Sequence, residues 1–472
     1  MSKRLIALLA LAFVFCIAGA AYAEVQNIKV SGDLFLHGIT RDSLTLKDND
    51  PSPNGYGETI NSFLSQVRLR VDADLTDNVA ATVRLLNERT WGDEADYATV
   101  TAKANNSEVD IDLAYVTLKE FLNSPVTVVV GRQGLRYGNG LVVGDPDTNG
   151  IADGHGTTAR YLPNSLDDLS VRKSFDAIKA ILNYDPLIVD LVYSKIDENN
   201  VGATDDISLY GVNAAFQVDD TLTTETYLWN RARKATGSGA TVGNTQTENL
   251  RTVGSRAVFT GFENIILGLE GAFQFGDHIA NTALYPNERS ANVPRNRKVT
   301  AYAIQAVAQL ALPDLDLSPV ISGSYTYLSG DPYLSESDNY RGWDPMYEDQ
   351  AGGTLYNKIL GYSNAQLFNL NGTVVPMEDV KVTLKYWYLR LNRPFTVDAT
   401  SVVLSGVTGD PSYRMNADKK ELGHEVDLIV SYDYTEDVQF VLNTGVFLPG
   451  DAFHSDNEKK ATQVIGSMKV SF

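Results

Sequence analysis

The sequence predicts an all-β fold: a transmembrane antiparallel β-barrel of about 18 strands, with short periplasmic turns and long extracellular loops. Three observations predict it. The chain begins with an export signal, its side chains alternate with a period of two over most of its length, and its connections alternate between short and long. A strand places successive side chains on opposite faces, so a sustained period of two is the primary signal of a sheet with two different faces.

Residues 1–23 have the pattern of a cleaved secretory signal peptide. Two basic residues precede the apolar run 5–19, and Ala21-Tyr22-Ala23 supplies small residues before the cleavage point. The single cysteine, Cys16, lies within this signal, which excludes disulfides and thiolate metal sites from the mature chain. We expect Sec-type export of residues 24–472, which then form one barrel domain in the outer membrane of a Gram-negative cell.

Residues 63–75 show the alternation most clearly. The apolar face consists of Phe63, Val67, Leu69 and Val71, and the polar face consists of Gln66, Arg68, Arg70 and Asp72. Segments of this kind recur about 18 times, each roughly ten residues long, as expected for strands that cross a bilayer. No run of about 18 apolar residues follows the signal, so we expect no membrane-spanning helix.

The connections between these segments are of two kinds. Eight are short and rich in Asp, Asn, Gly or Pro, as at 77–78, 185–186 and 436–437, and nine are long and polar. A soluble sandwich or propeller also has alternating strands, but it gives no reason for strict alternation of loop length. The last segment, 462–472, is a predicted strand that ends in Phe472. We expect the barrel-assembly machinery to bind this segment.

A barrel of this size is too wide for side chains to fill, so a water-filled lumen is expected. Charged side chains should face it, because a Lys or Arg facing lipid near mid-bilayer costs about 2–4 kcal/mol. The basic residues assigned to the lumen are Arg68, Arg70, Arg84, Arg132, Arg136, Arg231, Arg233, Arg256, Lys381 and Lys385. They form either a ladder of cross-strand ion pairs or a field that guides an anionic solute.

The stretch 128–150, VVVGRQGLRYGNGLVVGDPDTNG, opens the long loop 133–173. Its glycines do not have the spacing of a dinucleotide-binding loop. Asp145, Asp147, Asn149 and Asp153 match part of a calcium-binding loop, although Gly156 replaces the usual final Glu. A weak surface Ca²⁺ site is therefore one hypothesis. The other is that the loop folds over the mouth or into the lumen, with Arg132 and Arg136 at the narrowest point.

Other residue classes have simpler interpretations. Acidic loop residues are expected to form a solvated outer rim; these include Asp48, Asp50, Glu58, Asp93, Glu94, Asp96, Glu348 and Asp349. Trp229 and Trp387 fall on the polar face of their predicted strands and are candidates for stacking on a sugar ring. Trp91 and several tyrosines near strand ends are candidates for the aromatic girdle at the membrane interface.

Four stretches resemble the alginate export family of outer-membrane barrels. They are VVVGRQGLRYGNG (128–140), RKSFDAIKAIL (172–182), YTYLSGDP (325–332) and LGHEVDLIVSYDYTEDVQFVLNTGVFLPGDAF (422–453). The resemblance follows the chain in order over nearly its whole mature length. It implies an eighteen-stranded barrel whose arginine-containing lumen passes a polyuronate to the cell surface.

Three function classes remain. The first is a passive channel for an anionic solute or an exported polysaccharide, or a general porin. The second is a barrel that serves as a sheath or scaffold for a partner protein, such as a secretion or electron-transfer complex or another periplasmic partner. An enzyme is disfavoured, because neither a Gly-x-Ser-x-Gly nor a His-Glu-x-x-His motif is present. The formal net charge of −20 disfavours a nucleic-acid partner.

Overall fold

The computed structural model describes residues 27–48, 59–92, 109–146, 166–198, 206–234, 247–279, 296–331, 337–350, 352–405 and 410–472. The expected signal peptide, residues 1–23, lies outside these ranges. Within them, no helix is both long enough and apolar enough to cross a membrane.

The fold is a closed antiparallel β-barrel of 18 strands, as predicted from the sequence. The barrel strands are β1 (Asn27–Asp42), β2 (Thr59–Thr76), β3 (Val79–Thr90), β4 (Asp110–Leu118), β5 (Val126–Gly134), β6 (Ser174–Tyr184), β7 (Leu187–Asp197), β8 (Ile207–Gln217), β9 (Leu222–Lys234), β10 (Thr247–Phe262), β11 (Ile265–Ile279), β12 (Asn296–Ala311), β13 (Val320–Leu328), β15 (Ala365–Met377), β16 (Val380–Leu391), β19 (Glu421–Asp433), β20 (Val438–Pro449) and β21 (Ala461–Ser471). Each pairs with its neighbours in chain order, and β21 pairs with β1 to close the barrel, from Asp33 opposite Ser471 to Asp42 opposite Thr462.

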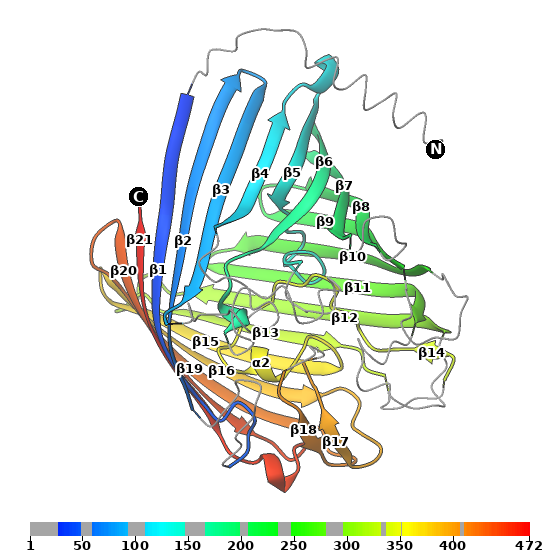
Figure 1. Cartoon of the computed structure of the whole chain (residues 1–472), viewed down its shortest axis with the longest axis vertical. Helices are drawn as coiled ribbons and strands as arrows, with labels where there is room; N and C mark the ends of the chain where they lie inside the picture. The colour runs from blue at the N-terminus through cyan, green and yellow to red at the C-terminus, as the bar shows by residue number, and fades with distance from the viewer. Residues whose placement is uncertain are drawn as a thin grey trace, which may run out of the picture.

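The connections alternate as the sequence predicts. The two-residue turns 77–78, 185–186 and 378–379 lie at one end, and loops of up to about forty residues lie at the other. Figure 1 shows β21 beside the start of β1, so the chain enters and leaves the barrel at the end that carries the short turns. The small hairpin β17 (Ala399–Val402) and β18 (Tyr413–Met415) lies at the opposite, long-loop end.

The two faces of the wall differ as the period of two requires. On β2, Phe63, Val67 and Leu69 are exposed on the outside, whereas Leu64 and Gln66 are buried on the inside. The outer face therefore presents apolar side chains to lipid. Closure of the sheet pairs the backbone groups of every strand, which is the condition for crossing a bilayer with strands.

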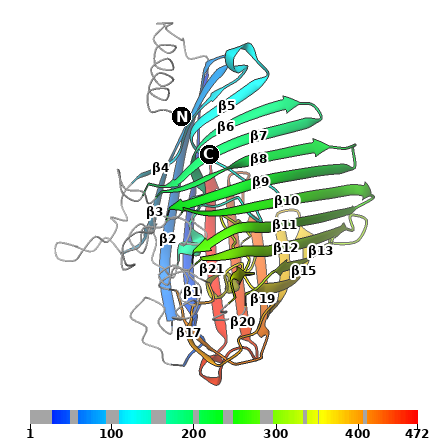
Figure 2. The same cartoon turned by 90° about the vertical axis from the view of Figure 1, so that its right-hand side faces the viewer.

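The main apolar core does not lie between two sheets but inside the barrel. It combines inward side chains of the wall with buried residues of two long loops, including Tyr137 and Val143 from one loop and Trp343, Met346 and Tyr347 from another. Figure 2, turned by 90°, shows the wall strands surrounding these connecting segments. The strand β14 (Asn339–Tyr340) pairs with β12 beyond the end of β13, at the long-loop edge of the wall. The interior also contains the short helix α2 (Tyr356–Ile359).

Candidate functional site

The loop between β5 and β6, residues 135–173 and here named loop 3, contacts inward side chains of strands β9 and β11. The Gly138 backbone N–H donates to Glu225 on β9 (2.8 Å), and the Asn139 N–H donates to Glu270 on β11 (2.8 Å). Gly138 has a left-handed φ of 60°, and a Cβ at this position would lie 2.4 Å from Glu270 Oε1. The left-handed φ and the short distance both favour glycine where the backbone approaches the wall so closely.

Aromatic packing holds the same segment of loop 3 in place. The ring of Tyr137 lies 4.9 Å from that of Trp229 on β9, and the Tyr137 hydroxyl donates to Asp190 on β7 (3.0 Å). Trp229 is fully buried, and Trp387 is covered in the same way by Tyr356 at 5.0 Å. The hypothesis that the two tryptophans are sugar platforms is wrong for this arrangement, because loop side chains occupy both rings.

A second loop joins loop 3 within the barrel, and sequence reasoning missed its role. This is loop 7, residues 329–364 between β13 and β15. The Gly144 N–H donates to the carbonyl of Tyr347 (2.7 Å), the Tyr347 N–H donates to that of Val142 (3.0 Å), and the Asp349 N–H donates to that of Gly140 (2.8 Å). These backbone bonds make the two loops one unit. The sequence signal was the presence of the large apolar residues Trp343, Met346 and Tyr347 within a stretch assigned to a polar loop.

Loop 7 also binds the wall through a buried ion pair. Asp344 accepts two bonds from Arg231 on β9 (2.9 and 2.5 Å), and Glu248 on β10 accepts from both Arg231 (3.3 Å) and Arg233 (2.7 Å). Burial opposes ionisation of Asp344, but the Arg231 charge outweighs it and lowers the pKa of Asp344. Arg231 and Arg233, both assigned to the lumen from the sequence, are buried in this network.

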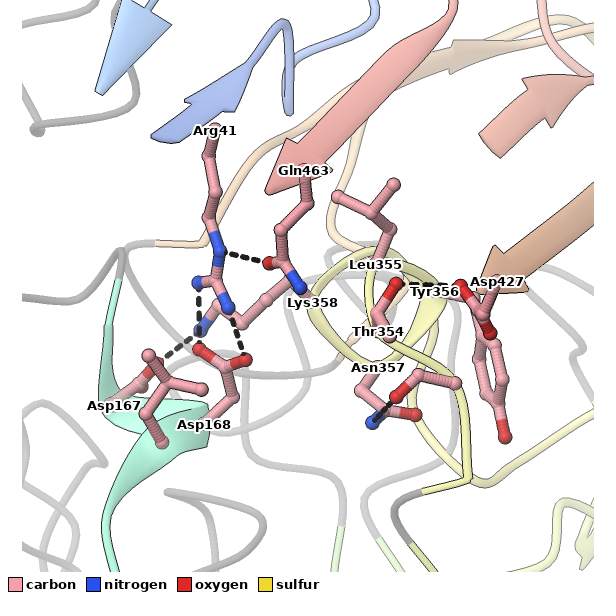
Figure 3. Close-up of polar contacts among 12 residues, drawn as sticks. Arg41, Asp167, Asp168, Thr354, Leu355, Tyr356, Asn357, Lys358, Asp427 and Gln463 are labelled. Carbon is pink, nitrogen blue, oxygen red and sulfur yellow. Dashed lines mark hydrogen bonds and ion pairs between the residues drawn. The ribbon is translucent and has the colours of Figure 1, made fainter. Parts of the chain in front are cut away.

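Helix α2 is held by one carboxylate of the wall. Glu425 on β19 accepts the backbone N–H groups of Thr354 (2.6 Å), Leu355 (3.0 Å) and Tyr356 (2.6 Å), and the Thr354 hydroxyl donates to Asp427 (2.7 Å). Figure 3 shows Thr354 and Asp427 facing each other across this contact. The carboxyl oxygens thus satisfy backbone N–H groups of the kind that a helix leaves unpaired at its start.

The returning end of loop 3 binds near the opposite side of α2. Asp168 accepts two bonds from Arg41 on β1 (2.8 and 2.6 Å), and Lys358 of α2 pairs with both Asp167 and Asp410. Figure 3 shows Arg41 and Lys358 converging on the two aspartates. Burial alone would lower the pKa of Lys358, but the charges of the aspartates outweigh it and raise that pKa.

Charged side chains gather where loops 3 and 7 meet. Asp349 accepts from Arg136 (3.1 Å) and from Lys173 (2.5 Å), and Lys173 also lies 3.8 Å from Asp145. Glu348 is 4% exposed, and burial raises its pKa to about 8. The prediction that Glu348 and Asp349 belong to a solvated outer rim is therefore wrong, because both lie at the junction of the two loops.

Several basic side chains of the lumen are more exposed than their carboxylate partners. Side-chain exposure is 21% for Arg84 against 0% for Asp112, 31% for Arg256 against 2% for Glu270, and 53% for Arg136 against 18% for Asp349. Two further pairs, Arg68 with Asp33 and Arg70 with Asp72, are exposed about equally on both sides. Lys385 donates to the carbonyl of Gly352 in loop 7 (3.0 Å), and Lys381 is exposed nearer the short-turn end of β16.

Arg132 does not face the lumen, and the prediction for it is corrected. The strand register pairs it with Asp176, on the same face as Val130 and the exposed Ile178, and it forms an ion pair with Asp176 (3.2 Å). Arg132 lies two residues from the outer end of β5. Near the interface, a charged side chain on the lipid face destabilises the barrel by only about 0–1 kcal/mol. The expectation that charged side chains face the lumen therefore does not hold at the rim.

The calcium hypothesis rests mostly on residues outside the described ranges. Asp147, Asn149 and Asp153 are among those residues, and only Asp145 is described. In the described part of the chain, no group of three or more His, Cys, Asp or Glu side chains is placed to hold a metal ion.

Comparisons with known proteins agree with this architecture. The family model described as Alginate export matches residues 41–467. Similar solved structures include OccK3 (OpdO) of Pseudomonas aeruginosa, with 12% identity, TM-score 0.53 and coverage of 95% of this chain and 97% of that one. OccAB1 of Acinetobacter baumannii has 12% identity, TM-score 0.53 and coverage of 96% and 99%.

A third similar structure is OpdK of P. aeruginosa, determined with vanillate, with 10% identity, TM-score 0.50 and coverage of 94% and 99%. No curated protein sequence matches the chain. Identities this low support the barrel fold alone, whereas the family match covers most of the chain. The chain belongs to the alginate export family, and it is an outer-membrane β-barrel channel.

Proposed function

We propose that the channel conducts anionic solutes that carry carboxylate groups, passively and through a lumen lined by exposed arginine and lysine. One observation carries the proposal: at the pairs of Arg84, Arg256 and Arg136, the basic side chain is more exposed than its carboxylate partner. A solute in the lumen therefore meets guanidinium groups first. Confinement between low-dielectric walls strengthens the resulting field.

Two of the comparisons support this solute class. Alginate, for which the family is described, is a polyuronate with one carboxylate per sugar, and vanillate, present in the OpdK structure, is a small aromatic carboxylate. Loops 3 and 7 pair with each other inside the barrel, so passage of a polymer requires them to separate. The same packing argues against the sheath hypothesis, since a partner polypeptide would have to displace both loops.

Reversal potentials in planar bilayers under a salt gradient test the proposal. We expect the wild-type channel to prefer anions, and we expect the triple variant Arg84→Gln, Arg256→Gln, Arg136→Gln to lose most of that preference. The matched control is Arg132→Gln with Arg251→Gln, which removes two arginines from the outer face and should leave selectivity unchanged. Cation preference that persists in all three proteins would exclude an anionic solute.

A further inference from the structure

The lipid-facing surface carries a cavity that the channel function does not use. Gly38 on β1 and Gly466 on β21 are directly opposite each other in the register and together leave the outer face without side chains at that point. The cavity over them measures about 480 Å³, and its lining is mostly apolar. A glycine inside a strand often marks a place where another group approaches the backbone closely.

The lining residues form a continuous row across five strands. Phe63 on β2 lies opposite Gly38, Leu442 on β20 lies opposite Gly466, and Val430 on β19 lies opposite Leu442. Five strands at about 4.8 Å spacing give a row about 19 Å long. The row is oblique to the membrane normal, because barrel strands are themselves tilted by about 35–45°.

One end of the cavity has an aromatic wall. The ring of Trp91, at the outer end of β3, stacks on that of Phe63 with centroids 5.3 Å apart, and the Trp91 N–H donates to the Phe63 carbonyl (2.9 Å). Both residues are more than half exposed on the lipid face. In contrast, Trp229, Trp343 and Trp387 are buried inside the barrel. Trp91 is therefore the tryptophan whose fluorescence reports on this cavity.

We propose that this cavity is a binding site for one acyl chain of a membrane lipid. The site faces the hydrocarbon region and its lining residues carry no formal charge, apart from the inward-facing His37 of β1. One leaflet of hydrocarbon is about 15 Å deep, and a row about 19 Å long at this inclination spans about 11–14 Å of that depth, so a chain that follows the row stays within one leaflet. Removing one methylene fully from water contributes about 0.8 kcal/mol of favourable free energy. An acyl chain in a bilayer is already out of water, so only closer packing over the two glycines favours binding at this site.

Substitutions that fill the cavity test whether it binds an acyl chain. A Cβ at Gly466 meets no atom within 4 Å, so Gly466→Leu starts its side chain in open space over the cavity floor, and we expect it to fill the cavity. Gly372 on β15 is the matched control: it shares the outer face of Phe368 and Leu370, its Cβ position is equally open, and it lies outside the cavity. Leu442→Trp is a second filling variant, in case Gly466→Leu assembles poorly.

The first measurement is native mass spectrometry of the full barrel released from detergent. We expect one retained lipid per wild-type barrel and per Gly372→Leu barrel, and loss of that lipid from both filling variants. The second is quenching of Trp91 in vesicles that contain a small fraction of phosphatidylcholine with brominated acyl chains. Wild type should be quenched several-fold more than Gly466→Leu, and Trp91→Phe should remove the difference.

Two results would overturn the proposal. Equal quenching in wild type and Gly466→Leu, together with equal lipid retention, would mean that the cavity holds only freely exchanging bulk lipid. A dimer that dissociates in the filling variants would mean that a second copy of the chain covers this face. Neither result bears on anion selectivity, so failure here is distinguishable from failure of the channel proposal.

Discussion

Arg41 and Asp168 form a two-bond ion pair, with nitrogen–oxygen distances of 2.8 and 2.6 Å, between the barrel wall and the returning end of loop 3. Arg41 is fully buried. Arg–carboxylate pairs of this geometry are directional as well as charged, so the pair fixes where the loop ends and β6 begins. The position of loop 3 therefore depends on contacts at both of its described ends, at Tyr137 and at Asp168.

Removing the carboxylate at 168 should release the end of the loop. In Asp168→Ala the Arg41 guanidinium stays buried without its charged partner, which in comparable pairs costs about 3–5 kcal/mol. We expect faster amide hydrogen exchange across 166–173. Asp456→Ala is the control, because Asp456 pairs with Arg414 at an exposed site. An exposed ion pair contributes only about 0–1 kcal/mol to stability. Unchanged exchange in Asp168→Ala would show that Lys358 and Asp167 suffice to hold the segment.

The wall could be predicted from the sequence because it follows one local rule. The period of two placed Phe63 outside and Gln66 inside, and turn residues marked the strand ends. The packing of the loops could not be predicted in this way. Glu425 binds the backbone of Thr354, 71 residues away in sequence, and nothing near either residue specifies the partner. The parity rule also failed at Arg132, two residues from the end of β5, because a charge near the interface costs only about 0–1 kcal/mol on the outer face.

The contact between Tyr137 and Trp229 should control the conductance. In Tyr137→Ala the first segment of loop 3 loses its ring contact with Trp229 and its bond to Asp190, so we expect a larger and noisier single-channel current. Tyr137→Phe keeps the ring and loses only the hydroxyl, so its current should stay close to that of wild type. Single-channel recordings that show equal currents for wild type and Tyr137→Ala would mean that this segment does not narrow the path.

Asp349 should tune selectivity, because it pairs with both Arg136 and Lys173. In Asp349→Asn the two cations keep their positions without a neutralising charge, so the anion-to-cation permeability ratio should rise by a few-fold. The measurement is the reversal potential under a salt gradient. Asp451→Asn, at an exposed pair with Lys419, removes the same charge from the outer surface and should change the ratio little. A fall in the ratio for Asp349→Asn would contradict the proposed anion path.

Glu348 gives the loop junction a pH dependence with a definite sign. Burial raises its pKa to about 8 from an ordinary value of 4.5, the nearby carboxylates of Asp145 and Asp349 add to the shift, and Lys173 opposes it. Tyr362, also buried against this group, stays neutral because burial raises its own pKa. The paired loops thus favour protonated Glu348, so their pairing is strongest below pH 4.5 and weakens as pH rises to 8, by up to about 1.4 kcal/mol per pH unit.

We therefore expect the open fraction of single channels to increase between pH 5 and pH 8. Glu348→Gln keeps the shape of the neutral side chain and cannot ionise, so this variant should remain in the low-conductance state across the range. Glu458→Gln, which changes an exposed carboxyl in the loop before β21, should respond to pH as the wild type does. If Glu348→Gln keeps the wild-type pH response, another group controls the separation of loops 3 and 7, since the buried carboxyl is the one group that this substitution removes.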